Sequence, residues 1–155
     1  MTLDRPPPRT HGRLDPRLCG RPAELAPGRS RVEMTATAEM AADENGLVHG
    51  GFVFGLADHA AMLAVDEPTV VLAGAEVRFI APVRVGERLA ARAEVAAAEG
   101  RRRRVEVEVL RADGEGEGKT VFTGSFRCHV PERHVLVTAA ARPAAAAAGG
   151  ETAGS

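Results

Sequence analysis

The 155-residue sequence contains no tryptophan, no tyrosine and only two cysteines. Cys19 and Cys128 are too few for a disulfide framework, and they lack the spacing of metal ligands. No run of about 18 apolar residues is present, which excludes a transmembrane helix. The formal net charge is −1, so the chain lacks the surplus of lysine and arginine with which nucleic-acid-binding proteins neutralise phosphates. These absences lead us to expect a soluble, cytoplasmic protein with no nucleic-acid or membrane partner.

Both ends of the chain are poor in large apolar side chains. The first twelve residues include three consecutive prolines among polar residues, without the apolar stretch of a secretory signal. From residue 136 onward the chain becomes rich in alanine and glycine. Such segments bury too little apolar surface to offset the cost of ordering the backbone. We therefore expect disordered tails at residues 1–12 and 136–155, and one folded domain at residues 13–135.

Five segments of this domain have the alternation of apolar and polar residues that is typical of half-buried strands. The clearest alternation is Val-Glu-Val-Glu-Val at residues 105–109. Gly74 predicts a bulge or bend within one strand, and Gly100 predicts a hairpin turn. The five segments are residues 30–38, 69–79, 89–97, 105–110 and 120–130. Consecutive strands of this kind predict a mostly antiparallel sheet.

The segment Val48–Val65 is apolar on nearly all sides for about five helical turns. A helix without a polar face is expected to be buried on most sides. One strand before it and four after it predict an α+β fold in which a sheet wraps around one central helix. Gly50 and Gly51 would each cost about 1 kcal/mol in a helix interior, so we interpret them as N-terminal positions that something approaches closely.

The run from Asn45 to Asp58, N-G-L-V-H-G-G-F-V-F-G-L-A-D, resembles the signature of hotdog-fold acyl-CoA thioesterases of the PaaI-like group. In that group His-Gly-Gly opens the central helix, and an acidic residue follows nine positions after the histidine. The segment Val77–Glu87 resembles the strand–Pro–x–x–x–Gly segment of the same group. The resemblance covers about residues 28–131. It implies a hotdog fold and hydrolysis of acyl-CoA thioesters, with no metal and no organic cofactor.

The spacing of His49 and Asp58 bears on how such a site is assembled. Nine residues at 100° each leave the two side chains about half a turn apart in direction, with a rise of about 13 Å. One chain is therefore not expected to bring both residues to one site. The resemblance implies that the site lies at the interface of a homodimer, or of a dimer of dimers.

The resemblance also implies roles for individual residues. The Gly50 N–H is the oxyanion donor, and Asp58 is the general base for water or the nucleophile that forms an anhydride. His49 holds the thioester, Asn45 orients the carboxylate or the water, and Gly51 leaves space for the thioester. The residues expected to bind the substrate are Gly51, Phe52, Phe54, Met62, Phe79 and Arg104.

Several of these residues also have a purely structural interpretation. His49 is suited to forming a hydrogen bond near the helix start, and Asn45 lies in a Glu-Asn-Gly turn signal. Residues 101–104, four consecutive arginines, are typical of a solvated hairpin end, or of contact with the phosphates of coenzyme A.

The sequence departs from the family pattern in one strand. Many relatives carry a serine or threonine on the strand after the helix, whereas residues 70–79 contain neither, and only Thr69 is available. Glu76 and Arg78 are unexpected charges in the same strand.

Two other functions stay open. A hotdog hydratase or dehydratase fits less well, because the order of histidine and acidic residue resembles the thioesterase pattern. A non-catalytic acyl-CoA-binding module usually accompanies a DNA-binding helix-turn-helix, for which we find no room in these residues.

Overall fold

The computed structural model describes residues 6–113 and 116–140. Its elements, in chain order, are α1 Pro16–Cys19, β1 Arg21–Ala26, β2 Arg29–Thr35, a 3₁₀ turn at Ala38–Met40, α2 Gly50–Val65, β3 Val71–Phe79, β4 Arg88–Glu99, β5 Arg102–Asp113, β6 Gly116–His129 and α3 Val135–Ala140. No helix in the described part of the chain is long and apolar enough to cross a membrane.

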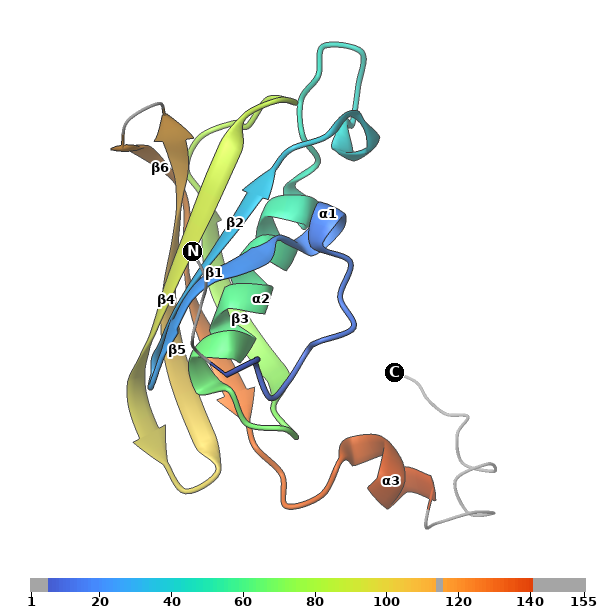
Figure 1. Ribbon diagram of the computed structural model, residues 1–155, viewed down its shortest axis with the longest axis vertical. Coiled ribbons are helices and arrows are strands. Elements are labelled where there is room, and N and C mark those ends of the chain that lie inside the picture. Colours follow the sequence, from blue (N-terminus) through green and yellow to red (C-terminus); the bar gives the residue numbers. More distant parts are fainter. Residues whose placement is uncertain (1–5, 114–115, 141–155) are drawn as a thin grey trace.

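The strands form one antiparallel sheet in the order β1-β2-β4-β5-β6-β3, and α2 lies against one face of it (Figure 1). This arrangement confirms the expected α+β hotdog fold. Strands β1 and β3 form the two edges of the sheet. The free edge of β3 ends near two exposed apolar side chains, Phe79 and Ile80, which are 56% and 54% exposed.

Each of the five expected strands overlaps a strand of the structure, and two local predictions are confirmed. The register of β3 with β6 shifts between Leu72 and Gly74, and this shift is the bulge that Gly74 predicted. Gly100 lies in the turn between β4 and β5 with a φ of 59°. The sequence did not predict β1, which contains Pro22; an edge strand tolerates a proline because one side of its backbone needs no sheet partner.

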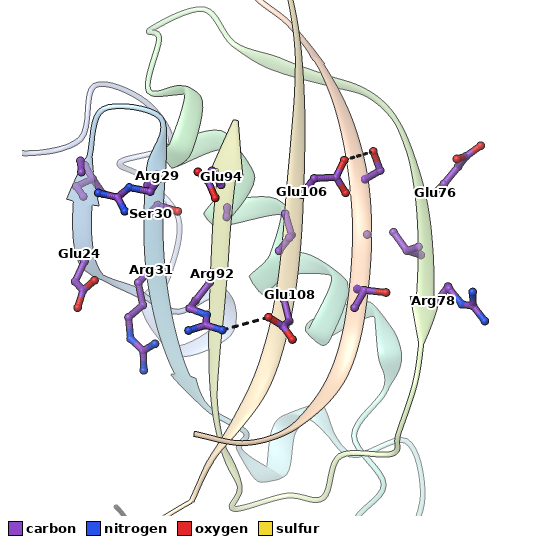
Figure 2. A pocket seen from close by; sticks show the side chains of 18 residues that line it. Glu24, Arg29, Ser30, Arg31, Glu76, Arg78, Arg92, Glu94, Glu106 and Glu108 are labelled. Carbon is purple, nitrogen blue, oxygen red and sulfur yellow. Dashed lines mark hydrogen bonds and ion pairs between the residues drawn. The ribbon is translucent and has the colours of Figure 1, made fainter. Parts of the chain in front are cut away.

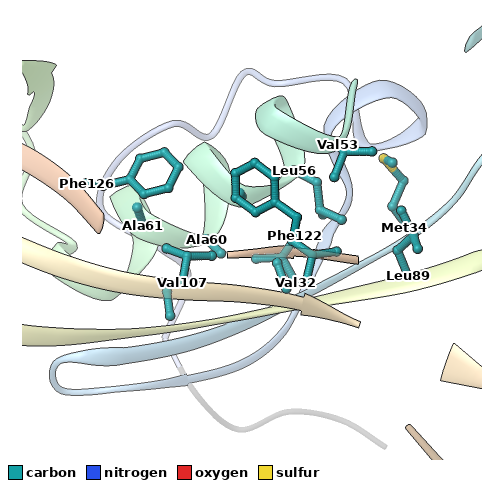
Figure 3. Packing of buried hydrophobic residues seen from close by; sticks show 14 of the residues in the cluster. Val32, Met34, Val53, Leu56, Ala60, Ala61, Leu89, Val107, Phe122 and Phe126 are labelled. Atoms are coloured by element: carbon teal, nitrogen blue, oxygen red, sulfur yellow. The ribbon is translucent and has the colours of Figure 1, made fainter. Parts of the chain in front are cut away.

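The core lies between α2 and the sheet (Figure 3). Leu56, Ala60 and Ala61 of α2 are fully buried against strand residues such as Phe122 and Phe126 of β6. Because α2 has no polar face, its burial requires cover from several elements, and it contacts β1 to β6 as well as α1.

Both ends of α2 are defined by backbone conformation. His49 is the N-cap residue in an extended conformation, and its side chain makes no capping hydrogen bond. Asp66 is the C-cap residue in the left-handed conformation, and its N–H donates to the Met62 carbonyl.

Parts of both expected tails have defined positions in the structure. Thr10 is buried, and α3 occupies Val135–Ala140. The remainder of the two expected tails, residues 1–5 and 141–155, lies outside the described residues.

The packing of Phe122 leads to a prediction about stability. Its ring is fully buried between the rings of Phe54, Phe79 and Phe126. We expect Phe122→Ala to lower the free energy of unfolding by about 3–5 kcal/mol, because the change leaves a cavity. Chemical denaturation at fixed protein concentration measures this loss. Leu136→Ala, at a side chain that is 70% exposed, is the control and should cost less than about 0.5 kcal/mol; equal losses would contradict the proposed core.

Candidate functional site

Asp58 is the only acidic residue within α2, and its carboxylate is poorly solvated. Its Oδ1 is buried and has no hydrogen-bond partner. Burial raises the pKa of Asp58 from 3.8 to about 6. A buried acceptor without a partner is costly, so this carboxylate is a candidate for chemistry.

Asp58 lies on a helix face that also carries two glycines. Residues three and four positions apart share a face, which places Gly51, Gly55, Asp58 and Met62 in one stripe. A Cβ atom added at Gly55 would meet nothing within 4 Å. The helix is therefore open to a ligand or a second chain beside the carboxylate.

A cavity of about 620 Å³ adjoins this carboxylate. Asp58 and Met62 form its helical side, and residues 68–72 line it from the start of β3. Residues 8–12 and residues 134–135 complete the lining. Thr69 lies here, but its hydroxyl donates to the Pro131 carbonyl at 2.7 Å, so it is committed to the backbone.

Burial disfavours the charged forms of three other titratable side chains in this region. His59 is 5% exposed, its Nδ1 lies 3.0 Å from the Cys19 carbonyl oxygen, and burial lowers its pKa. Burial and the charge of Asp58 raise the pKa of Cys128 to about 12. His11 has a pKa lowered by burial and by the charge of His59.

The start of α2 forms a second candidate region. Gly50 is the first residue of the helix, so its N–H has no acceptor within the helix. A Cβ at Gly50 would lie 3.1 Å from the ring of Phe79, and a Cβ at Gly51 would lie 3.0 Å from the imidazole of His49. Only small residues leave this space free. A small, largely apolar cavity of about 280 Å³ is lined by Gly50 and Phe79, among others.

Asn45 lies in the turn that precedes this helix start. Its N–H donates to Asp43 Oδ1 at 2.9 Å, and its side chain is exposed. Asn45, His49 and Gly50 therefore lie toward the N-terminal end of α2, and Asp58 lies about two turns further along the helix. Within one chain the structure does not bring them to one site.

The aromatic residues and Met62 divide between the two regions and the core. Met62 is buried beside Asp58, and Phe79 covers Gly50. Phe52 makes an edge contact with His49, with ring centroids 6.1 Å apart. Phe54 packs on Phe126 with ring centroids 5.4 Å apart, so it belongs to the core.

The sheet face opposite α2 carries a separate, charged groove of about 1010 Å³ (Figure 2). There Arg92 donates to Glu108 at 3.2 Å, and Ser125 donates to Glu106 at 3.0 Å. Arg104 pairs with Glu106 at this face and so lies away from the Asp58 cavity. Among the described residues no group of three or more His, Cys, Asp or Glu side chains could hold a metal ion.

Residues 8–12, which line the Asp58 cavity, were expected to belong to a disordered tail. Their composition resembles a tail, and no local pattern indicates contact with a residue about 50 positions away. The only signal was that a solitary carboxylate in an apolar helix requires cover from elsewhere.

Comparison of the chain with known proteins finds a matching family. The model of the thioesterase superfamily matches residues 45–117, which include Asn45, His49, Gly50 and Asp58.

Two solved structures are similar to the chain over most of its length. An uncharacterized protein of Pyrococcus horikoshii is 48% identical, with a TM-score of 0.80, over 86% of this chain and 99% of the other. A variant of the phenylacetic acid degradation protein PaaI of Thermus thermophilus is 30% identical, with a TM-score of 0.65, over 74% of this chain and 95% of the other.

Two curated relatives are longer than this chain. Methylthioribose-1-phosphate isomerase of Aquifex aeolicus is 44% identical over 117 residues, which are 74% of this chain and 26% of the isomerase. Transcription factor FapR of Bacillus velezensis is 37% identical over 82 residues, which are 53% of this chain and 42% of FapR. The chain thus spans about a quarter of the first protein and about two fifths of the second.

The raised pKa of Asp58 predicts a pH-dependent stability. The Asp58 carboxyl has a pKa of about 6 in the folded protein and near 3.8 in the unfolded chain. Its protonation therefore stabilises the folded protein fully below about pH 4, and this stabilisation is lost as the pH rises through 6. We expect Asp58→Asn to raise the free energy of unfolding by about 1–3 kcal/mol at pH 8 and to give no gain at pH 4. Denaturation between pH 4 and pH 8 measures this. Glu44→Gln, at an exposed carboxylate, should leave the pH dependence unchanged; a gain from Asp58→Asn that does not vary with pH would contradict the burial of charge.

Proposed function

Because the chain belongs to the thioesterase superfamily, as a PaaI-like hotdog protein, we propose that it hydrolyses acyl-CoA thioesters to a free acid and CoA. The observation that carries this proposal is the Asp58 carboxylate, buried on one side without a partner and bordering a cavity on the other. A pKa of about 6 leaves it ionised near neutral pH yet able to accept a proton.

The reaction requires a base and a group that stabilises negative charge. With Asp58 as general base, a water oxygen attacks the thioester carbonyl while Asp58 accepts the water proton. The negative charge that forms on the carbonyl oxygen is stabilised by the Gly50 N–H at the positive end of the helix dipole. When the C–S bond breaks, the CoA sulfur takes the proton from Asp58. The alternative, in which Asp58 attacks as a nucleophile and forms an anhydride, uses the same two groups.

A second copy of the chain would bring these groups together. Strand β3 is an edge strand, with Phe79 at one end and Val71 at the other. If two β3 edges paired antiparallel about a two-fold axis over their full length, Phe79 of one copy would lie opposite Val71 of the other. Phe79 covers Gly50, and Val71 lines the Asp58 cavity, so each pairing would unite one helix start with one carboxylate.

The proposed dimer also gives positions to the remaining candidate residues. His49, Asn45, Gly51 and Phe52 would approach the thioester from the copy that supplies Gly50. Met62 would contact the acyl group from the copy that supplies Asp58. Arg104 lies on the opposite face of the sheet, so its expected contact with the CoA phosphates would need another copy of the chain packed on that face.

A non-catalytic acyl-CoA-binding module is the second candidate. The similarity to FapR, which is named as a transcription factor and not as an enzyme, supports the non-catalytic part of this alternative. The two functions differ in turnover, because a binding module holds the thioester without cleaving it. The activity of the Aquifex isomerase belongs to a protein of which this chain matches about a quarter.

Turnover tests the role of Asp58. Thiol release from a panel of acyl-CoAs should fall about 100- to 10,000-fold in Asp58→Asn, because the base is lost while the shape is kept. In the wild type kcat should decrease below about pH 6, as Asp58 becomes protonated. Glu33→Gln, at an exposed carboxylate of β2 that pairs with Arg31, is the matched control and should retain activity. Binding of every acyl-CoA without turnover of any would overturn hydrolysis in favour of the binding module.

Subunit complementation tests the shared site. Gly50→Pro removes the N–H at the first helical position, where proline is well tolerated, but it also adds a ring beside Phe79. Gly50→Ala is the steric control, because it places a methyl group beside Phe79 and keeps the N–H, so it should lose less activity than Gly50→Pro. Each of Asp58→Asn and Gly50→Pro should be inactive alone. Co-expression should restore about a quarter of the wild-type activity, because half of the randomly formed dimers carry one intact site of two. Mass spectrometry confirms that heterodimers form. If these heterodimers show no activity, a site built from two chains is contradicted.

A further inference from the structure

The segment Pro8–Gly12 lies along the cavity that contains Asp58. All five of its residues line that cavity, and Thr10 is 8% exposed. In Figure 1 the dark blue N-terminal segment runs beside the lower end of α2, which is the C-terminal end of that helix. The segment therefore separates part of the cavity from solvent.

Contacts with the C-terminal end of α2 fix this segment in place. The Arg9 N–H donates to Asp66 Oδ1 at 2.7 Å, and the Arg9 guanidinium lies 3.8 Å from the Glu67 carboxylate. Next in the chain, Thr10 Oγ1 lies 2.7 Å from His11 Nδ1. The two contacts of Arg9, with Asp66 and with Glu67, hold the segment against the helix end, whereas the contact of Thr10 lies within the segment.

The wall that faces this segment is mainly apolar. Met62 of α2 and Val70, Val71 and Leu72 at the start of β3 line it. The one hydroxyl there, on Thr69, is already bonded to a backbone carbonyl. These apolar side chains suit a hydrocarbon chain, which gains free energy by leaving water, while Arg9, His11 and His134 give the same cavity polar lining as well.

We propose that Pro8–Gly12 is the outer wall of the acyl-binding cavity and sets the length of acyl chain that the protein accepts. The inference rests on the proposed function, because it places the acyl group of the thioester next to Asp58. It makes Arg9 and Gly12 residues that determine specificity, and neither takes part in the chemical step.

Gly12 allows the cavity to be narrowed. A Cβ at Gly12 would meet nothing within 4 Å, and its φ lies outside the left-handed region, so a side chain can begin here without backbone strain. We expect Gly12→Leu to lower kcat/KM for longer acyl chains relative to acetyl-CoA, by about fourfold for each methylene that loses its place. Gly12→Ala should show a smaller change in the same direction.

Arg9 allows the wall to be loosened. Arg9→Ala removes the ion pair with Glu67, and the ratio of kcat/KM for longer to shorter chains should then rise severalfold. Arg17→Ala is the matched control, because Arg17 is similarly exposed and pairs with Asp15 away from this cavity. Its ratio should equal that of the wild type.

The test measures kcat/KM for straight-chain acyl-CoAs of increasing length with the full-length wild type and these variants. Opposite shifts in Gly12→Leu and Arg9→Ala would support the wall, whereas an unchanged length profile in both would overturn it. If the wild type hydrolyses no acyl-CoA, hydrolysis fails on its own. Binding of non-hydrolysable acyl-CoA thioethers of the same lengths then tests the wall separately, with the same two opposite shifts expected in Kd. Circular dichroism shows whether Gly12→Leu is folded. If Gly12→Leu does not fold, the length profile of Arg9→Ala alone decides for or against the wall.

Discussion

The need to bury a helix that has no polar face is the constraint on which the rest of this structure depends. The curved sheet covers one side of α2, and its core side chains fill the space between them. The other side carries glycines and Asp58, and the sheet does not cover it completely. The N-terminal segment covers part of this remainder. In the proposed function a second copy covers the rest, so the oligomer and the site would be consequences of one packing problem.

The same burial gives Asp58 its chemical character. A carboxylate in water is a weak base at neutral pH, but one that loses solvent holds its proton more tightly. The apolar surroundings that raise its pKa also destabilise the folded protein at neutral pH, since no partner compensates for the lost solvation. Such a cost within the helix that organises the core is typical of functional sites, where local stability is lower than the fold alone would allow.

Local patterns predicted the parts of the fold that depend on local chemistry. Alternation located five of six strands, and Gly74 and Gly100 marked a bulge and a turn. Strand β1 was missed because Arg-Pro-Ala-Glu-Leu-Ala lacks β-branched residues and regular alternation. The position of residues 8–12 was missed because it depends on tertiary contacts such as that between Arg9 and Asp66. The His-Gly-Gly motif and Asp58 were recognised by spacing, whereas the proposed meeting of these groups across two chains depends on a pairing of β3 edges that no single segment encodes.

The thiol of Cys128 has a consequence for the chemistry beside it. Thioesters exchange readily with thiolates, and a reactive cysteine near Asp58 would capture the acyl group from CoA and leave the protein acylated. With its pKa at about 12, Cys128 stays protonated and is a poor nucleophile. Burial, together with the charge of Asp58, would thus keep Cys128 from competing with water for the acyl group in the proposed reaction.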